Sequence, residues 1–448
     1  MTTLHSKFTA PLLDPHYQPL PIPRGEPTLR IALERNDGCV SIFNAALSGS
    51  SAADQLRHAE RLIKFFLWSR GGWRLFIHST DAVMERIAAA YTPGGARAFD
   101  ADLMAKIYER PFEVVRVENP DALPAAKESA TTLGGNLDGC RIGFDLGASD
   151  YKIAAVQGGE VVFADEFPWN PKEQSDPEYH YQHLNEGLRH AASMLPRVDA
   201  IGGSSAGVIV NNRFMVASLL RSIQPDKLET ARNLFLRLRE EWNVPFEVAN
   251  DGDVTALAGA MSLGVTGLLG IAMGSSLAAG YINPAGKMTG WINELAFAPV
   301  DFSPEAAVEE WSGDRGVGAL YFSQQAVNKL LPAAGFSTPP EMGLPERLKE
   351  VQASMKKQSS AAQNIFETIG IYLGHSLPAY AVFYEIEHVL ALGRVTTGEG
   401  GDIILAKARE VLASHYPELA RTISLHLPDE KSRRVGQAVA AASLPKIS

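Results

Sequence analysis

The sequence predicts an α/β protein, and three patterns support this prediction. Apolar runs of strand length alternate with amphipathic stretches of helix length along most of the chain. A segment at 119–139 that contains several prolines and glycines divides this alternation into two parts. The second part contains two similar strand–turn–strand patterns with glycine and serine in the turns, which indicates a duplicated scaffold.

The composition is that of an acidic globular protein. The 448 residues include 41 Lys and Arg against 51 Asp and Glu, a formal net charge of −10, and 46% of the residues are hydrophobic. A chain of this length can bury two or three cores, and its negative charge argues against nucleic acid as a partner. Two cysteines, Cys39 and Cys140, are too few for a disulfide framework. We therefore expect a cytoplasmic protein.

Two segments were tested for targeting or membrane insertion. Residues 1–28 are rich in proline and lack an apolar run of signal-peptide length, so they predict an extended arm. Residues 254–286 contain no Asp, Glu, Lys or Arg, but glycines interrupt them repeatedly. They predict buried strands rather than a membrane-spanning helix.

Residues 29–135 predict a self-contained α/β domain of unknown role. Strands are expected at 29–33, 40–43, 74–78 and 112–117, and helices at 52–68 and 81–91. Asn36-Asp37-Gly38, between the first two strands, is a strong hairpin signal. Trp68 and Trp73 flank a short Gly-containing loop, where core anchoring is favoured over a binding loop. We expect this domain to fold apart from the rest, although its apolar helix 62–68 leaves open that it docks on the core or on a second subunit.

After residue 139 the alternation starts again. Strands are expected at 141–145, 151–156, 161–167, 200–203, 246–248 and 389–392, and helices at 177–194, 227–242, 361–383, 401–412 and 431–442. Prolines divide 301–360 into short pieces, which we interpret as a helical insertion.

The first chemical motif is the strand 142–146 and the turn that follows it. Asp145 ends the strand, Gly147 and Ser149 occupy the turn, and Lys152 lies on the next strand. Such a turn lets backbone N–H groups and a hydroxyl approach a phosphate, while a carboxylate can hold a hydrated magnesium ion. Taken alone, the pattern is equally compatible with an ordinary hairpin.

The second motif has the same form. Gly274, Ser275 and Ser276 connect a buried strand to an apolar return strand. Two such hairpins in one chain suggest a scaffold that holds a nucleotide from both sides, and a Gly-rich sheet edge remains the alternative.

Between the two motifs, Asn250 and Asp251 follow an apolar strand and begin an Ala-rich helix. They could serve only as a helix cap. The functional interpretation is that Asp251 is a general base at a strand end, facing a substrate hydroxyl.

Together with residues 389–395 and Gly398, Gly400 and Gly401, these motifs resemble the actin-like ATPase and sugar kinase superfamily. The resemblance is strongest to its ROK group (repressor, open reading frame, kinase) and covers about residues 139–445. It implies a duplicated α/β fold of the actin-like ATPase (ribonuclease H-like) type with an additional amino-terminal α/β domain. Subdomain I would comprise residues 139–250 with the carboxyl-terminal helix 431–445. Subdomain II would comprise 251–430 with the insertion at 301–360.

The resemblance also implies roles for individual residues. Asp251 matches the catalytic base, and Asp145 matches the acid that holds Mg²⁺. The residues that match nucleotide-binding positions are Asp145, Gly147, Ser149, Lys152, Gly274, Ser275, Ser276, Gly393, Gly398 and Gly400. Those that match sugar-binding positions are Ser205, Asn250 and Glu294.

Several positions depart from the family's pattern. Phe297 stands where the family has a histidine, and no Cys-rich zinc segment follows it. Ser276 and Ala278 replace glycines, and Arg394 stands where glycine is usual. These changes leave both the substrate and the activity open.

The resemblance implies an ATP- and Mg²⁺-dependent sugar kinase of the hexokinase or glucokinase type that phosphorylates a hexose or hexose derivative. A non-catalytic sensor or regulator on the same scaffold, or another phosphotransferase, remains the alternative, and the retained Asp251 favours the enzyme. The expected partners are the sugar and ATP. A homodimer is left open, and neither nucleic acid nor a membrane is expected as a partner. The sugar, the hydroxyl and the role of residues 1–135 are not predicted.

Overall fold

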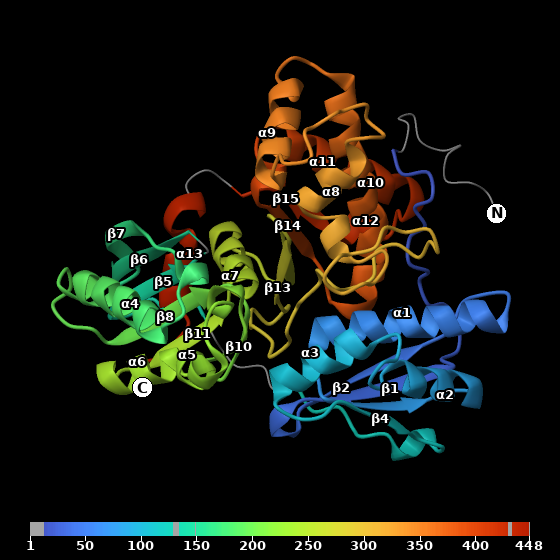
Figure 1. Ribbon diagram of the computed structural model, residues 1–448, viewed down its shortest axis with the longest axis horizontal. Helices are drawn as coiled ribbons and strands as arrows, with labels where there is room; N and C mark the ends of the chain where they lie inside the picture. Colours follow the sequence, from blue (N-terminus) through green and yellow to red (C-terminus); the bar gives the residue numbers. More distant parts are fainter. Residues whose placement is uncertain (1–12, 129–133, 148, 429–431, 448) are drawn as a thin grey trace.

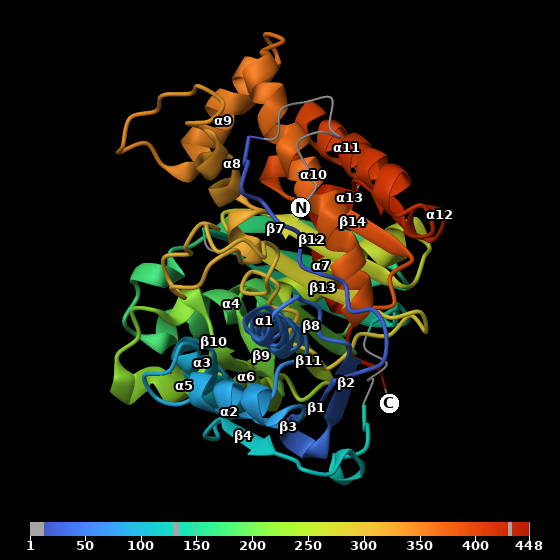
Figure 2. The same ribbon diagram turned by 90° about the vertical axis from the view of Figure 1, so that its right-hand side faces the viewer.

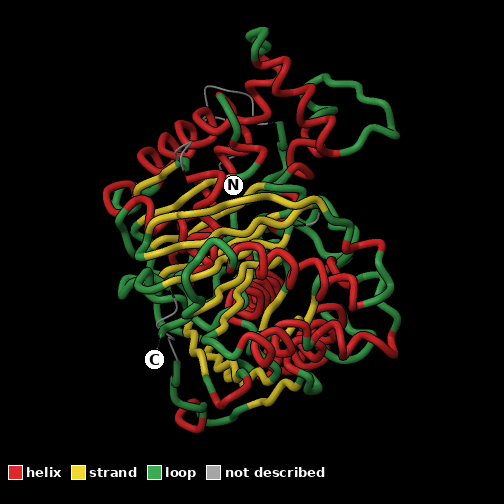
Figure 3. The backbone as a smooth tube through the Cα atoms, turned by 90° about the vertical axis from the view of Figure 1, so that its left-hand side faces the viewer, coloured by secondary structure: helices red, strands yellow, loops and turns green. Residues whose placement is uncertain are grey.

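The computed structural model describes residues 13–128, 134–147, 149–428 and 432–447. The described residues form three parts: an amino-terminal domain (blue to cyan), subdomain I (mainly green) and subdomain II (yellow to red), as Figure 1 shows. Figure 3 shows the strands in a central band with helices above and beside it. No helix in the described ranges is long and apolar enough to cross a membrane.

The amino-terminal domain is a four-stranded sheet covered by helices. Its strands are β1 (Leu29–Glu34), β2 (Val40–Ala45), β3 (Arg74–His78) and β4 (Glu113–Arg116), in the order β2-β1-β3-β4. Its helices are α1 (Ala52–Arg70), α2 (Asp81–Ala90) and α3 (Ala98–Tyr108). The Ser51 hydroxyl caps α1 by accepting the Asp54 N–H at 3.1 Å. The predicted order of elements is confirmed, except that sequence analysis did not identify α3.

Subdomain I contains a five-stranded sheet in the order β11-β8-β5-β6-β7. The strands are β5 (Cys140–Leu146), β6 (Asp150–Gln157), β7 (Glu160–Pro168), β8 (Ala200–Ser205) and β11 (Phe246–Asn250). Helices α4 (Pro177–Ala192), α5 (Leu228–Arg232) and α6 (Leu234–Trp242) pack with it, and a short hairpin, β9 (Val208–Val210) and β10 (Arg213–Val216), follows β8. The single helix predicted at 227–242 is therefore two helices, divided at Asn233.

Helix α13 (Ser432–Ala442), near the carboxyl terminus, returns to this sheet and lies directly on β5 and β8. A Cβ atom at Gly202 would lie 1.7 Å from the Ala441 carbonyl oxygen, so only glycine permits this contact.

Subdomain II contains a second sheet, in the order β13-β12-β14-β15. Its strands are β12 (Leu268–Met273), β13 (Leu277–Ile282), β14 (His388–Leu392) and β15 (Ser424–His426). Its helices are α7 (Asp251–Leu263), α8 (Gln324–Leu330), α9 (Leu344–Met355), α10 (Ser360–Phe383), α11 (Glu399–His415) and α12 (Leu419–Thr422). As in subdomain I, an antiparallel hairpin is followed by parallel strands. The predicted duplication is confirmed.

The prediction of a helical insertion at 301–360 is wrong for its first half. Within 301–323 the only helical element is a 3₁₀ turn at Gly318–Leu320, and the segment is held by isolated bridges such as Val308↔Arg315. Gly313 and Gly316 both adopt φ of +67°, which ends regular structure there. Helices α8 and α9 occupy the second half.

The amino-terminal domain shares one apolar core with subdomain II. The Phe65 ring of α1 stacks on Phe383 of α10 with centroids 4.2 Å apart, and Phe43 of β2 stacks on the same ring at 4.6 Å. Subdomain I has a core of its own. The expectation that residues 1–135 fold apart is therefore wrong, because the apolar residues of α1 serve both parts. Docking on the core, the alternative left open, is what the structure shows.

The amino-terminal arm, from residue 13 on, crosses subdomain II (Figure 2). The buried Tyr17 ring packs edge-on against Tyr372 with centroids 4.7 Å apart. Asp14 pairs with Lys329 at 3.0 Å. The arm thus connects the first domain to the helices of subdomain II.

Candidate functional site

Three parallel strands of subdomain I end level with one another. Asp145 of β5 is in register with Ser204 of β8, and Ser205 of β8 is in register with Asn250 of β11. The carboxyl ends of parallel strands form the usual binding edge of an α/β sheet. The first candidate residues therefore lie side by side at one edge.

Asp145 is buried at this edge and hydrogen-bonded. The Ser204 hydroxyl donates to its Oδ1 at 2.8 Å, and Gln437 of α13 donates to the Ser204 hydroxyl at 3.1 Å. Burial and the nearby Asp251 raise the pKa of Asp145 to about 6. Sequence analysis missed Gln437, because a single glutamine near the carboxyl terminus carries no local signal.

Asp251 is the first residue of α7, directly after β11. The Asn250 side chain caps this helix by accepting the Gly252 N–H at 2.7 Å, and its amide donates to the Gly207 carbonyl at 2.8 Å. Burial raises the pKa of Asp251. Asn250 is thus a helix cap, and the cap holds the backbone of Asp251 in place.

A neighbouring carboxylate, Asp253, lies deeper. Its Oδ1 accepts hydrogen bonds from the Asn293 amide at 2.9 Å and from the Tyr281 N–H at 3.3 Å. Burial raises its pKa to about 7. Through these hydrogen bonds Asp253 connects α7 to β13 and to Asn293, so its role is structural.

A pocket of about 570 Å³ opens between the two subdomains and the amino-terminal domain. This volume is typical of small-molecule sites. The candidate residues that line it are Asn250, Asp251, Gly274, Ser275, Ser276, Glu294 and Gly393. Trp68, Phe297, Glu309 and Trp311 also line it. Of the two tryptophans named in the sequence analysis, Trp68 is buried and also lines this pocket.

Glu294 has the most strongly perturbed carboxyl among the candidate residues. Burial, Asp251 and Asp253 raise its pKa to about 8. At neutral pH the side chain is therefore mainly protonated and can donate a hydrogen bond to a ligand oxygen.

The second hairpin turn borders the same pocket. The Gly274 N–H donates to the Ser276 carbonyl at 3.0 Å, and the side chains of Ser275 and Ser276 are exposed. Gly393, at the end of β14, adopts φ of +98°, and a Cβ atom there would lie 2.6 Å from the Met273 carbonyl oxygen. Glycine at 393 thus allows the loop after β14 to contact the end of β12 beside the second hairpin turn.

The first hairpin turn lies beside Asp145, and its residues do not line the 570 Å³ pocket. The Gly147 N–H donates to the Asp150 carbonyl at 3.0 Å, and the Trp169 indole N–H donates to the Gly147 carbonyl at 2.9 Å. Ser149 is exposed, and Lys152 lies opposite Asp145 across the hairpin. The turn is tight, as predicted, although Ala148 lies outside the described residues.

Two further candidates, Gly398 and Gly400, line a second pocket of about 440 Å³ with Lys349, Lys356 and Phe366. Ser205 lines neither pocket, because its buried hydroxyl turns toward the Ala206 carbonyl at 3.5 Å. Its neighbours Ala206 and Gly207 take that place in the larger pocket.

Among the described residues no group of three or more His, Cys, Asp and Glu side chains could hold a metal ion. Mg²⁺ has a different requirement, because it is commonly held by one or two carboxylates and the substrate phosphates. Asp145, at a strand end beside the first hairpin turn, supplies one such carboxylate, although it is buried and lines neither of the two pockets.

The comparisons with known proteins bear on the fold. No family model and no curated protein matches the sequence. Among solved structures, a ROK family transcriptional regulator described as a homologue of the E. coli MLC protein superposes with a TM-score of 0.53 at 19% identity, over 68% of this chain and 78% of the other. The chain has the fold of ROK proteins.

Two ROK kinases superpose on this chain with similar TM-scores and identities. The hexokinase from Thermus thermophilus has a TM-score of 0.52 at 16% identity, over 67% of this chain and 97% of its own. The Streptomyces griseus glucokinase, solved with glucose and AMPPNP, has a TM-score of 0.52 at 17% identity, over 68% of this chain and 99% of its own. The predicted actin-like ATPase fold is confirmed. Because the neighbours include a regulator and kinases, the function depends on the site itself.

Proposed function

We propose that this protein is an ATP-dependent sugar kinase that transfers the γ-phosphoryl group to a hydroxyl of a hexose or hexose derivative. The observation that carries the proposal is the placing of Asp251 in one pocket with Asn250, Glu294 and the turn at Gly274. This set combines a base, hydrogen-bonding groups for a sugar and a backbone turn for phosphate, which is what in-line phosphoryl transfer requires.

In this mechanism each residue has a distinct task. Asp251 accepts the proton of the attacking hydroxyl, and Asn250 keeps Asp251 in position by capping α7. Protonated Glu294 donates to a sugar oxygen without adding a negative charge beside Asp251. The exposed hydroxyls of Ser275 and Ser276 and the N–H groups of their turn bind phosphate oxygens.

The nucleotide would extend from the second hairpin turn toward the 440 Å³ pocket, where Gly398 and Gly400 border a space beside Phe366. Phe366 and Met355 offer apolar contacts to adenine, and Lys349 and Lys356 add positive charge. Asp145 would hold Mg²⁺, which neutralises charge on the transferring phosphates when bound.

Mutations at the two hairpins test the nucleotide site. We expect Asp145→Ala and Gly274→Val each to weaken Mg·ATP binding by about tenfold or more, because one removes the carboxylate and the other blocks close backbone approach. The measurement is calorimetry with a non-hydrolysable ATP analogue. Gly290→Val is the matched control, because a Cβ atom at Gly290 meets open space and Gly290 lines neither pocket. Wild-type affinity in both hairpin variants would place the nucleotide elsewhere.

Glu294 makes sugar binding depend on pH. Its pKa lies at about 8 instead of 4.5, so the donor hydrogen is present below pH 8 and is lost as the pH rises through that value. We expect the dissociation constant of the sugar to rise above pH 8 in the wild type and to stay level in Glu294→Gln, which keeps a donor. By the same linkage, the contribution of Glu294 to the free energy of unfolding decreases from about pH 4.5 to pH 8. Parallel pH profiles of sugar binding in the two proteins would contradict this role.

The second candidate function is a non-catalytic sugar sensor, and the regulator among the structural neighbours is the observation in its favour. A sensor needs the sugar contacts but has no use for a base. The position of Asp251 in the pocket therefore favours the kinase.

A further inference from the structure

One side of the 570 Å³ pocket is an aromatic wall formed by Trp68, Phe99, Phe297 and Trp311, and the proposed phosphoryl transfer does not use it. Trp68 and Phe297 have ring centroids 4.5 Å apart, and Trp311 meets Phe99 at 5.4 Å and Phe297 at 5.3 Å, both edge-on. Two of the rings come from the amino-terminal domain and two from subdomain II. Trp68, Phe297 and Trp311 border the pocket that also contains Asp251.

Trp311 differs from the other rings of the wall in its exposure. Trp311 is 61% exposed, whereas Trp68 and Phe297 are buried. A large apolar side chain left in solvent costs free energy unless a ligand covers it. Since Trp311 borders the pocket, the ligand of that pocket is the partner available to it.

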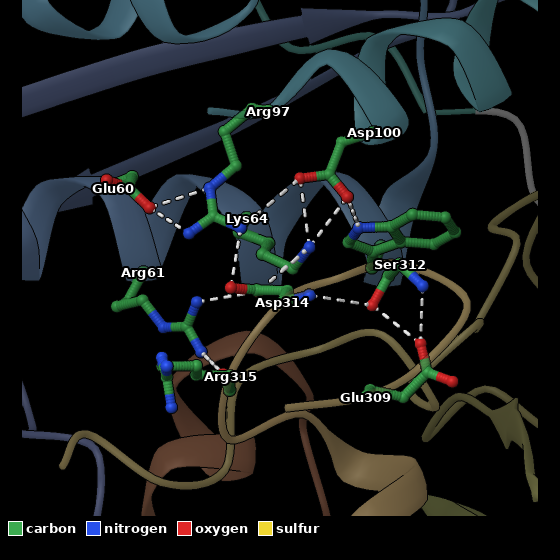
Figure 4. Close-up of polar contacts among 10 residues, drawn as sticks. Glu60, Arg61, Lys64, Arg97, Asp100, Glu309, Ser312, Asp314 and Arg315 are labelled. Atoms are coloured by element: carbon green, nitrogen blue, oxygen red, sulfur yellow. Dashed lines mark hydrogen bonds and ion pairs between the residues drawn. The ribbon is translucent and has the colours of Figure 1, made fainter. Parts of the chain in front are cut away.

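The backbone around Trp311 is tied down, so its exposure does not come from a loose loop. The Glu309 carboxylate accepts the Trp311 N–H at 3.1 Å and the Ser312 N–H at 2.7 Å, which closes a tight turn. The Glu309 N–H in turn donates to the Asp314 carbonyl at 2.7 Å. Figure 4 shows this turn beside a cluster of charged side chains.

That ion cluster connects the turn to the amino-terminal domain. Asp314 forms ion pairs with Arg61 at 2.8 Å, Arg97 at 2.9 Å and Lys64 at 3.2 Å (Figure 4). Arg61 and Lys64 lie on α1, and Arg97 is the residue just before α3. Despite burial, these cations hold the pKa of Asp314 well below its usual range. Asp100 binds Lys64 at 2.7 Å and also accepts the Trp68 indole N–H at 2.9 Å. The same cluster thus fixes both tryptophans of the wall.

We propose that Trp311 is a specificity-determining residue that packs on an apolar substituent of the sugar, and that the amino-terminal domain positions it through the ion cluster around Asp314. This inference rests on the proposed function, since it takes the pocket to be the sugar site. The substrate class is a hexose derivative with an apolar substituent, either the methyl of an N-acyl group or a short alkyl aglycone. An apolar substituent packs on an aromatic face without desolvating a polar group, whereas a hydroxyl in the same position loses its hydration there.

Phe297 supports this choice of substrate. It is buried and packs between Trp68 and Trp311. The pocket therefore presents an apolar surface at this point, which favours an apolar group on the ligand.

The test compares sugars without ATP, by calorimetry on the full-length protein. The probes are a hexose, its N-acetylamino derivative and its methyl glycoside. We expect the wild type to bind one substituted sugar at least about tenfold more tightly than the parent, and we expect Trp311→Ala to lose that preference, mainly through weaker binding of the substituted sugar. Trp311→Phe should retain part of the preference. Trp242→Phe, in the separate core of subdomain I, is the control and should behave as wild type.

A second variant tests the positioning role. Arg61→Met removes one cation from Asp314 while keeping the length of the side chain, and Arg57→Met on the same helix is the matched control, because Arg57 packs on Phe302 outside the cluster. We expect Arg61→Met to reduce the preference for the substituted sugar severalfold and to leave binding of the ATP analogue unchanged.

Each outcome bears on the inference separately from the kinase proposal. An unchanged preference in Trp311→Ala, or a wild type that binds none of the three sugars or binds them equally, would overturn the role of Trp311. An unchanged preference in Arg61→Met alone would overturn the positioning role of the amino-terminal domain. Selective sugar binding without phosphoryl transfer would keep the inference and remove the kinase assignment.

Discussion

Asp251→Asn is expected to reduce the rate of phosphoryl transfer by ~10²–10⁴ while sugar affinity changes only a few-fold. Asparagine keeps the shape of the side chain and removes the carboxylate that accepts the hydroxyl proton. The Gly252 N–H donates to Asn250 Oδ1 at 2.7 Å and to Asp251 Oδ1 at 2.9 Å. The backbone of residue 251 should stay in place, because asparagine at 251 keeps an Oδ1 acceptor and the Asn250 cap is unchanged. The measurement is the turnover rate, with sugar binding measured by calorimetry on the same preparation.

Asp253→Asn is the comparison for this variant. Asp253 is buried and already accepts hydrogen bonds from Asn293 and Tyr281, so we expect it to affect stability more than the chemical step. Full turnover in Asp251→Asn would refute the assignment of the base, and loss of turnover without loss of stability in Asp253→Asn would move the base two residues along the chain.

The largest expected effect on stability is at Asp314. Asp314→Asn removes the negative charge shared by Lys64, Arg61 and Arg97. Lys64 keeps Asp100 and Arg97 keeps Glu60, but Arg61 loses its ion-pair partner, and leaving a buried cation unpaired costs about 3–5 kcal/mol. Because the amino-terminal domain and subdomain II share a core, we expect the two to lose structure together at a lower urea concentration. The measurement is urea unfolding followed by circular dichroism.

Glu305→Gln is the matched control for Asp314→Asn. Glu305 lies on the same irregular segment and pairs with His16 at 3.1 Å, but both side chains are well exposed. Exposed pairs contribute about 0–1 kcal/mol, so the urea midpoint should barely move. Equal midpoints for the two variants would show that the ion cluster does not hold the domains together.

The parts of the site that sequence analysis predicted are those with local signals. A glycine turn after an apolar strand identified the loops at Gly147 and Gly274, and a polar pair at a strand end identified Asn250 and Asp251. Because β5, β8 and β11 are parallel, their carboxyl ends lie at one edge of the sheet. Motifs at these strand ends are therefore close together in space.

The parts that were missed depend on packing between distant segments. Trp311 lies in an irregular segment, and its place in the pocket is set by Asp314 and the cations of another domain. Gln437 reaches Ser204 from the far end of the chain. The strongly apolar α1 was recognised, but its docking on Phe383 could not be distinguished from a subunit contact.

Similar limits apply to Ser205 and to the segment 301–360. Ser205 was predicted to bind the sugar, but it is buried, and the residues after it, Ala206 and Gly207, line the pocket. Which residue at the end of β8 faces the pocket depends on the local turn of the backbone. The prolines of 301–360 were interpreted as divisions between short helices, whereas in 301–323 Gly313 and Gly316 adopt positive φ in an irregular segment.

The measurement that tests the kinase proposal most directly is turnover of Mg·ATP by the purified full-length protein with hexoses, N-acetylhexosamines and their acids. ADP release is followed together with mass spectrometry of the sugar. We predict a sugar phosphate formed in equal amount to ADP with at least one of these sugars, and none with Asp251→Asn. Tight, saturable sugar binding with no sugar phosphate from the wild type under any of these conditions would contradict the proposal and assign the scaffold to sensing.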